Sequence, residues 1–349
     1  MGSRILSFIG LFILSAFPAW SQTGEWKDEY SRFTDLTPWV RSSNPAGIAT
    51  LPVDKTSTVR ASLEKKNGGL MDLHESRDCF RPSLDAASYM RISDRITFYG
   101  RMNYSYFKGK DMGGQILMAP YYNPINFLES VDTTTGTKTL EEYTLEGAMA
   151  YSLNDRLTLA GKVSYQSADY AKRKDPRSYN QWMDLDASVG ARYSLADGKT
   201  AFGVSLNYVK TVETVAEKLF GTIDRQYYCF VDYGGSFGKV EVIDGDNGYL
   251  SVSNERPMFN QFFGGSAQAG FKVGGVDAFL DLGAAYRKGY FGKKASGSVR
   301  FCDFDGMRYN LNARISFKTG NLLNRIDGSW NMMTSLNLSL IHISEPTRL

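Results

Sequence analysis

The sequence has very little histidine and cysteine, and this shortage excludes several kinds of site. Only His74 and His342 occur among the 349 residues, too few for a histidine-rich metal centre. Hydrolases that activate a serine need a histidine within hydrogen-bond reach of it, and His74 lies in a polar stretch that we expect to be a solvated loop. Cys79, Cys229 and Cys302 are far apart and form no CxxC pair, so neither a zinc site nor a redox motif is indicated. We therefore expect no catalytic residue, no metal and no cofactor. The sequence is equally compatible with a disulfide between two of the cysteines and with three unpaired thiols.

Charge of one sign and long internal apolar runs are missing too. The 40 Lys and Arg residues nearly balance 37 Asp and Glu, for a formal charge of +3, so no nucleic-acid partner is expected. No internal stretch reaches the about 20 apolar residues of a spanning helix, which excludes a bundle of transmembrane helices. By contrast, 34 Gly, 21 Tyr and 21 Phe accompany only 10 Pro, a composition that favours many strands and turns.

The two ends of the chain differ from the rest. Arg4, the apolar run 5–17 and the small-x-small site 19–21 are the three parts of a secretory signal, so we expect residues 1–21 to be a signal peptide that is removed. Residues 341–349, IHISEPTRL, break the preceding alternation and resemble translated adapter sequence, so we expect a non-native tail there.

Most of the remaining sequence alternates between apolar and polar residues. In 95–107, for example, Ile96, Phe98 and Met102 share one parity while Arg101 lies on the other. Because a Lys or Arg that faces lipid at mid-depth costs about 2–4 kcal/mol, the position of the charges separates a membrane barrel from other sheets. The charges fall on the polar parity, which we expect to line the lumen: Arg101, Glu142, Glu146, Lys162, Asp184, Asp186, Arg192, Asp281, Arg287 and Arg314.

This pattern predicts an all-β fold, an antiparallel transmembrane β-barrel. A soluble sandwich would show similar alternation, but tyrosines bracket the apolar stretches, as at Tyr143 and Tyr151, like the aromatic girdles of membrane barrels. Short turns also alternate with long stretches that we expect to be irregular, at 108–139, 167–180, much of 211–260 and 288–305. Eleven strands are predicted, at 58–66, 85–92, 95–107, 141–151, 156–166, 181–193, 200–212, 261–273, 276–287, 307–317 and 322–340. Bacterial barrels have even strand numbers, so we expect about 14 strands in an intact protein, with the barrel over 57–340 and a periplasmic or plug segment over 22–56.

The segment before the first strand carries a recognisable motif. Together with Gly68-Gly69, Ser88-Tyr89 and the loop 119–124, the string 39–48 (WVRSSNPAGI) resembles an uncharacterised outer-membrane β-barrel family of Bacteroidota, which implies a fold and a location but no substrate. Asn44-Pro45-Ala46-Gly47 is also similar to the N-terminal motif of long-chain fatty-acid channels, in which this segment forms a plug. Asn-Pro followed by Ala-Gly favours a turn in any context, so a simple turn into the first strand is the plainer alternative.

The lumen-facing charges have mixed signs, which predicts neither strong anion nor strong cation selectivity. They either pair across strands and fill a closed lumen or line a hydrated pore; residues 25–55 or the loop 108–139 could supply a plug. We expect an outer-membrane channel or accessory nutrient-uptake component, not an enzyme. Its expected partners are outer-membrane lipid and lipopolysaccharide, a small-molecule solute and a TonB-dependent uptake system. A fatty-acid-type channel and a non-transporting surface or assembly protein are the alternatives.

Overall fold

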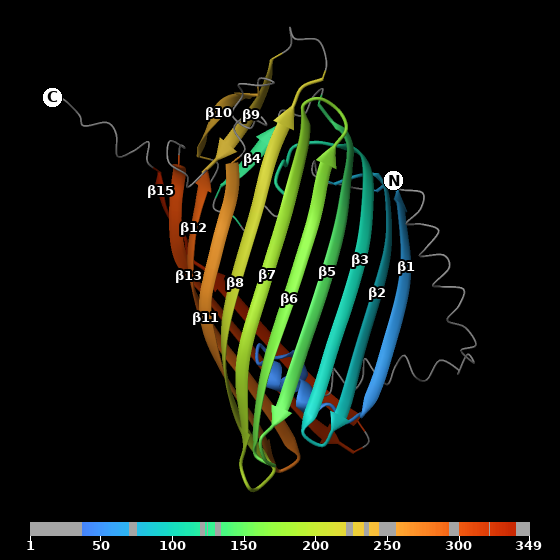
Figure 1. Ribbon diagram of the computed structural model, residues 1–349, viewed down its shortest axis with the longest axis vertical. Helices are drawn as coiled ribbons and strands as arrows, with labels where there is room; N and C mark the ends of the chain where they lie inside the picture. The colour runs from blue at the N-terminus through green and yellow to red at the C-terminus, as the bar shows by residue number, and fades with distance from the viewer. Residues whose placement is uncertain are drawn as a thin grey trace, which may run out of the picture.

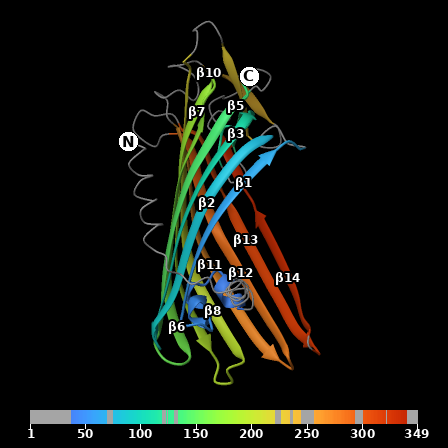
Figure 2. The same cartoon turned by 90° about the vertical axis from the view of Figure 1, so that its right-hand side faces the viewer.

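The protein is built around one antiparallel sheet of eleven long strands that curls on itself (Figures 1 and 2). The computed structural model describes residues 37–69, 75–118, 123, 125–129, 134–220, 226–233, 237–243, 256–292, 300–320 and 322–339. The long strands are β1 (Lys55–Asn67), β2 (Asp78–Ser93), β3 (Ile96–Met112), β5 (Gly136–Ser152), β6 (Leu157–Lys172), β7 (Arg177–Ser194), β8 (Thr200–Lys218), β11 (Arg256–Val273), β12 (Val276–Gly292), β13 (Arg300–Thr319) and β14 (Leu322–Met333).

Each long strand pairs with its neighbours in this order, and the short β15 (Leu336–Ser339) adds to β13. The predicted all-β, antiparallel barrel fold and its eleven strands are confirmed. Among the described residues β1 and β14 form the two edges of the sheet and are not paired with each other, so the wall is not closed (Figure 2).

The two faces of the wall differ as the alternation predicts. On β8 the side chains of Phe202, Val204 and Leu206 are exposed on the convex face, while Ala201 and Ser205, on the other parity, are buried. Successive side chains of a strand point to opposite faces, so the same division continues across the sheet. The convex face is therefore apolar and the concave face polar.

Short turns join the strands at one end of the wall, the turn end, at the bottom of Figure 1. Between β11 and β12 the two turn residues are Gly274 and Gly275, whose φ values of +59° and +83° fit a two-residue turn that demands positive φ at both positions. The turn before β8 is held by Asp197, which accepts hydrogen bonds from the amides of Lys199 and Thr200 at 2.9 and 3.1 Å.

At the opposite end, the loop end, the strands run further than the sequence predicts. The expectation of a long irregular loop over 167–180 is wrong, because β6 continues to Lys172, β7 begins at Arg177, and Ala171 still pairs with Tyr179. Here polar residues occupy both parities, so alternation no longer marks the strand although the ladder of backbone hydrogen bonds continues. Residues 211–218 likewise belong to β8.

A second, smaller sheet crosses the loop end. It has the order β10-β9-β4 and consists of β4 (Asn126–Glu129), β9 (Tyr227–Asp232) and β10 (Gly238–Ile243) (Figure 1). Two 3₁₀ helices, η1 (Pro38–Arg41) and η2 (Pro45–Thr50), lie within the curl of the large sheet near the turn end (Figures 1 and 2). Within the described residues, no helix has the length and apolar character needed to cross a membrane.

Candidate functional site

Residues 37–51, the N-terminal segment, lie against the concave face. Asn44 caps η2, because its side-chain Oδ1 accepts a hydrogen bond from the amide of Ala46 at 3.0 Å, and Pro45 occupies the first helical position, where its missing N–H costs nothing. Pro45, Ala46 and Gly47 are buried. The motif 44–47 thus forms a local turn and also contacts the wall.

Asn44 joins three strands of the wall. Its carboxamide nitrogen lies 2.9 Å from the Ala191 carbonyl oxygen of β7, 3.1 Å from that of Val204 on β8, and 2.9 Å from Oε1 of Gln268 on β11. The two N–H groups are shared among three acceptors, and the residue is 2% exposed. Buried polar groups that lose such partners are costly, so these contacts hold the segment in place.

A carboxylate network adds a second attachment. The amide and hydroxyl of Ser43 donate to Asp281 on β12 at 2.9 and 2.8 Å, and Gln268 Nε2 donates to the same carboxylate at 2.9 Å. Asp281 is 1% exposed. Hydrogen bonds to an ionised acceptor are stronger than neutral ones, so a buried charge on the wall anchors the segment.

Two glycines of the wall leave room for this attachment. A Cβ on Gly190 would lie 2.2 Å from Asn44 Oδ1, and one on Gly203 would lie 2.7 Å from atoms of both Asn44 and Trp39. Trp39 packs edge-on against Phe279 with 5.1 Å between ring centroids. The shape of the wall is therefore fitted to the N-terminal segment.

A polar cavity of about 840 Å³ lies beside the segment on the concave face. Of the ten charged residues predicted to face the lumen, Arg101, Glu146, Lys162 and Asp186 line it. Lys162 pairs with Glu146 at 2.6 Å, and Arg101 pairs with Asp85 at 2.7 Å. These charges are thus partnered across strands.

The other predicted residues are spread along the wall. Arg192 stacks over the Trp39 ring at 4.9 Å, and Arg314 pairs with Asp327 on β14 at 2.5 Å. Hydrogen-bond donors reach the remaining two carboxylates: Ser105 to Glu142 at 3.1 Å and Thr211 to Asp184 at 2.7 Å. Arg287 lies nearer the loop end, fully buried, where its guanidinium donates to Asn260 at 2.6 and 2.9 Å.

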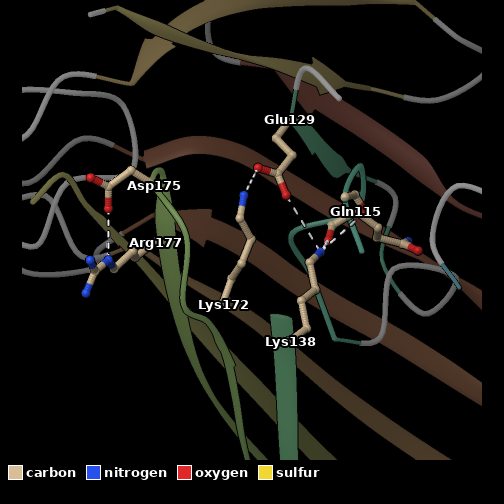
Figure 3. Close-up of polar contacts among 7 residues, drawn as sticks. Gln115, Glu129, Lys138, Lys172, Asp175 and Arg177 are labelled. Carbon is tan, nitrogen blue, oxygen red and sulfur yellow. Dashed lines mark hydrogen bonds and ion pairs between the residues drawn. The ribbon is translucent and has the colours of Figure 1, made fainter. Parts of the chain in front are cut away.

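Between β3 and β5, the described residues 113–118 and 125–129 pack against the wall at the loop end. Glu129 of β4 lies between two lysines of the wall, in contact with Lys172 and 3.8 Å from Lys138, and all three side chains are at most 2% exposed (Figure 3). Lys138 also donates to the Gln115 carbonyl at 2.5 Å. One buried cluster of ion pairs therefore fixes both ends of the segment.

Burial shifts the protonation of this cluster. It lowers the pKa of Lys138 to about 8 and raises the pKa of Glu217, a buried carboxyl on β8, to about 8. The charge of Glu129 also raises the pKa of Glu217, whereas the ammonium groups of Lys172 and Lys138 oppose the rise. Desolvation is the dominant cause of both shifts.

Apolar packing completes the closure of the loop end. Ile116, Leu117 and Phe127 of the inward segment pack with residues of the wall and of β9: Val215, Cys229, Val231, Met258, Phe291, Cys302 and Phe304. Glu213 accepts a hydrogen bond from the Met118 amide at 2.6 Å, and Asn180 donates to the Ile116 carbonyl at 2.8 Å. The N-terminal segment therefore lines the cavity, while residues 113–118 and 125–129 pack against the wall at the loop end.

Sequence reasoning missed the cluster of Glu129, Lys138, Lys172 and Glu217. Its members lie in stretches expected to be irregular, and no sequence signal distinguishes them from solvated loop charges. The three cysteines are buried free thiols. His74, the expected signal peptide 1–21 and the tail 341–349 lie outside the described residues.

Comparisons with known proteins place the chain only broadly. A family model described as "Family of unknown function (DUF6850)" matches residues 45–339. No curated protein matches the chain. Among solved structures, the crystal structure of the outer membrane transporter YddB from Escherichia coli aligns with 74% of this chain and 35% of that one, at 10% identity and a TM-score of 0.39. The chain thus spans about a third of that transporter's length.

Proposed function

The chain belongs to DUF6850, a family of unknown function, and we propose that it is an outer-membrane β-barrel protein that passes a small hydrophilic solute through its lumen. In this proposal the N-terminal segment, residues 37–51, is a plug and the segment 113–129 closes the loop end. The protein reaches the outer membrane through a cleaved signal peptide at 1–21.

The apolar convex face supports the membrane location. Met149, Val189 and Leu206 expose 48%, 59% and 67% of their surfaces there. On β5 the apolar stretch runs from Tyr143 to Tyr151, eight steps that at about 3.3 Å each and a tilt of about 40° cover roughly 20 Å. That height is close to the about 25 Å apolar band of membrane barrels, so outer-membrane lipid and lipopolysaccharide would cover this face.

The observation that carries the transport proposal is the polar cavity of about 840 Å³ on the concave face, which the plug helps to line. The plug is attached by the hydrogen bonds of Ser43 and Asn44 and is not a strand of the wall, so it can leave without unfolding the sheet. The ion pair Lys162–Glu146 interrupts any apolar path through the lumen, which disfavours the fatty-acid-type channel. A TonB-dependent uptake system is the partner we propose for plug release.

The closed loop end favours a second candidate function. The apolar cluster around Ile116 and Phe127 and the buried Glu129 seal that end. A permanent seal would fit a non-transporting surface or assembly protein that binds a partner through its loops.

Conductance in planar bilayers separates the two functions. We compare the full chain with Gly190→Ala, which displaces the plug, with Glu129→Gln, which weakens the loop-end closure, and with the double variant. The transport proposal predicts low conductance of the intact protein and the largest rise in the double variant. The control combines Gly147→Ala with Arg177→Gln, which together should leave conductance unchanged. A Cβ on Gly147 meets no atom within 4 Å, and Arg177→Gln breaks a separate ion pair, to Asp175, at the loop end (Figure 3). A correctly folded double variant that conducts no more than the intact chain would leave the second function standing.

A further inference from the structure

One row of cross-strand partners surrounds the cavity at a single height. It runs from Tyr99 on β3 through Ala148, Lys162, Ser188 and Asn207, each directly opposite the next. Gly264 and Ala285 then continue the row from Asn207 to Arg308 on β13. All of these residues except Gly264 line the cavity. The row is therefore a continuous belt of the inner wall.

Small residues create the space within this belt. Ala148, Ser188 and Ala285 alternate with long side chains, and Gly264 next to Asn207 has no side chain at all. A Cβ on Gly264 would lie 2.6 Å from the Asn207 carboxamide oxygen. The cavity thus results from the sequence of the belt and not from loose packing.

Each charge that lines the cavity faces a charge of opposite sign. Lys162 is paired with Glu146 at 2.6 Å and Arg101 with Asp85 at 2.7 Å, Asp186 faces Lys162 and Arg308, and Arg41 faces Asp327. A ligand with a net charge of either sign would have to compete with these contacts. The lining therefore favours a solute without net charge.

Uncharged hydrogen-bonding groups remain available. Four lining carboxamides form no hydrogen bond to any residue that the structure describes: Asn207, Asn310, Asn312 and Asn331. Asn310 and Asn331 are direct partners on β13 and β14, and Asn310 fits over Gly283, where a Cβ would approach it to 2.4 Å. Each carboxamide offers two donors and an acceptor, which matches hydroxyl groups, since these both donate and accept.

The plug contributes apolar side chains to the same cavity, beside its polar residues 41–44. Val40, Ile48 and Leu51 line it together with the ring of Tyr99. An apolar patch opposite carboxamides suits a molecule whose C–H face is apolar and whose edges carry hydroxyls. Aromatic rings provide apolar surface of this kind beside a polar tip.

We infer that the cavity binds a neutral polyhydroxylated solute, a sugar or polyol, between the belt of β3–β13 and the plug. Its volume of about 840 Å³ lies within the about 300–1,000 Å³ typical of small-molecule sites. The inference rests on the proposed function in taking this cavity as part of the passage.

Calorimetric titration of the purified full chain tests the inference, with the loop-end variant Glu129→Gln measured alongside so that solute can enter while the plug stays in place. The probes are sucrose and sorbitol, with gluconate and choline as charged comparisons. We expect sucrose or sorbitol to bind, gluconate and choline to bind at least tenfold more weakly, and Asn310→Leu/Asn331→Leu to weaken sugar binding by about tenfold or more.

The matched control is Asn154→Leu, which alters an exposed asparagine in a turn that does not touch the cavity. Equal or tighter binding of a charged probe, or sugar binding that ignores Asn310→Leu/Asn331→Leu, would overturn the inference. Absence of sugar binding in a chain whose double variant conducts ions would reject the solute class and leave the proposed function intact. Sugar binding without any conductance would support the solute class and reject the proposed transport function.

Discussion

Replacing Gly190 by alanine should release the plug without altering a single residue of the plug. The added Cβ would lie 2.2 Å from Asn44 Oδ1 and 2.9 Å from Cδ of Pro45, closer than real contacts allow. Asn44 would have to turn its carboxamide away from the wall. The contacts with Ala191 and Val204 would then be lost together with the cap on Ala46.

The size of the effect follows from these bonds. A typical intramolecular hydrogen bond contributes about 0.5–1.5 kcal/mol, so losing the three from Asn44 to the wall weakens docking by about 1.5–4.5 kcal/mol. Since 1.4 kcal/mol is a factor of ten, the undocked population should rise roughly 10- to 1,000-fold. The alanine itself is tolerated in a strand, and Gly147→Ala on β5 serves as the control because no atom lies within 4 Å of its added Cβ.

Hydrogen exchange measured by mass spectrometry over 37–51 in the full chain reads this population directly. The amide of Ser43 donates to Asp281 and that of Ala46 to Asn44, so both should be protected in the intact protein. Exchange should accelerate in Gly190→Ala and stay unchanged in Gly147→Ala, while β7 and β8 remain protected in both. Equal exchange of the segment in the two variants would refute the docking described above.

Three further predictions concern the loop end and the convex face. Glu129→Gln leaves Lys138 and Lys172 without their shared carboxylate, and breaking a buried ion pair costs about 3–5 kcal/mol. Amide hydrogen exchange over 113–118 should therefore accelerate, whereas Arg177→Gln should have no effect there. Unchanged exchange in Glu129→Gln would mean that the ion pairs do not hold this segment. Burial raises the pKa of Glu217 from 4.5 to about 8. The stability that this carboxyl contributes is therefore full below a pH of about 4.5 and is lost as the pH rises through about 8. The melting temperature should fall from pH 5 to pH 8, and Glu217→Gln should flatten that dependence. Leu206→Lys on the convex face should cost about 2–4 kcal/mol in urea unfolding from lipid bilayers, and Phe220→Lys at the loop end much less; equal costs would show that lipid does not cover Leu206.

The sheet could be predicted from the sequence because its signal is local. Residues such as Ile96, Phe98 and Met102 mark one face every second position, and the charge on Arg101 assigns the opposite face to the interior. These two observations predict the strands, their parity and the polar concave side. They fail beyond the apolar stretches, as at 167–180, where polar residues occupy both faces and only backbone pairing reveals the strand.

The closures could not be predicted because their contacts are distant in sequence. Asn44 reaches acceptors 147, 160 and 224 residues away, and no local pattern shows that Gly190 and Gly203 leave space for it. Glu129, Lys138 and Lys172 likewise come from three different strands, β4, β5 and β6. The motif 44–47 indicated a turn or a plug, and only the fold places it against β7, β8 and β11.

Sucrose release from proteoliposomes tests the central claim most directly, since that claim is a polar passage closed at both ends. Vesicles loaded with radiolabelled sucrose and a large dextran would carry the intact chain, Gly190→Ala, Glu129→Gln or the double variant. Sucrose release through the intact chain should be slow. Because the two closures are independent and in series, the release rate of the double variant should rise by a factor near the product of the two single-variant factors. Dextran should stay inside the vesicles throughout. Sucrose retained by a folded double variant as well as by the intact chain would contradict it.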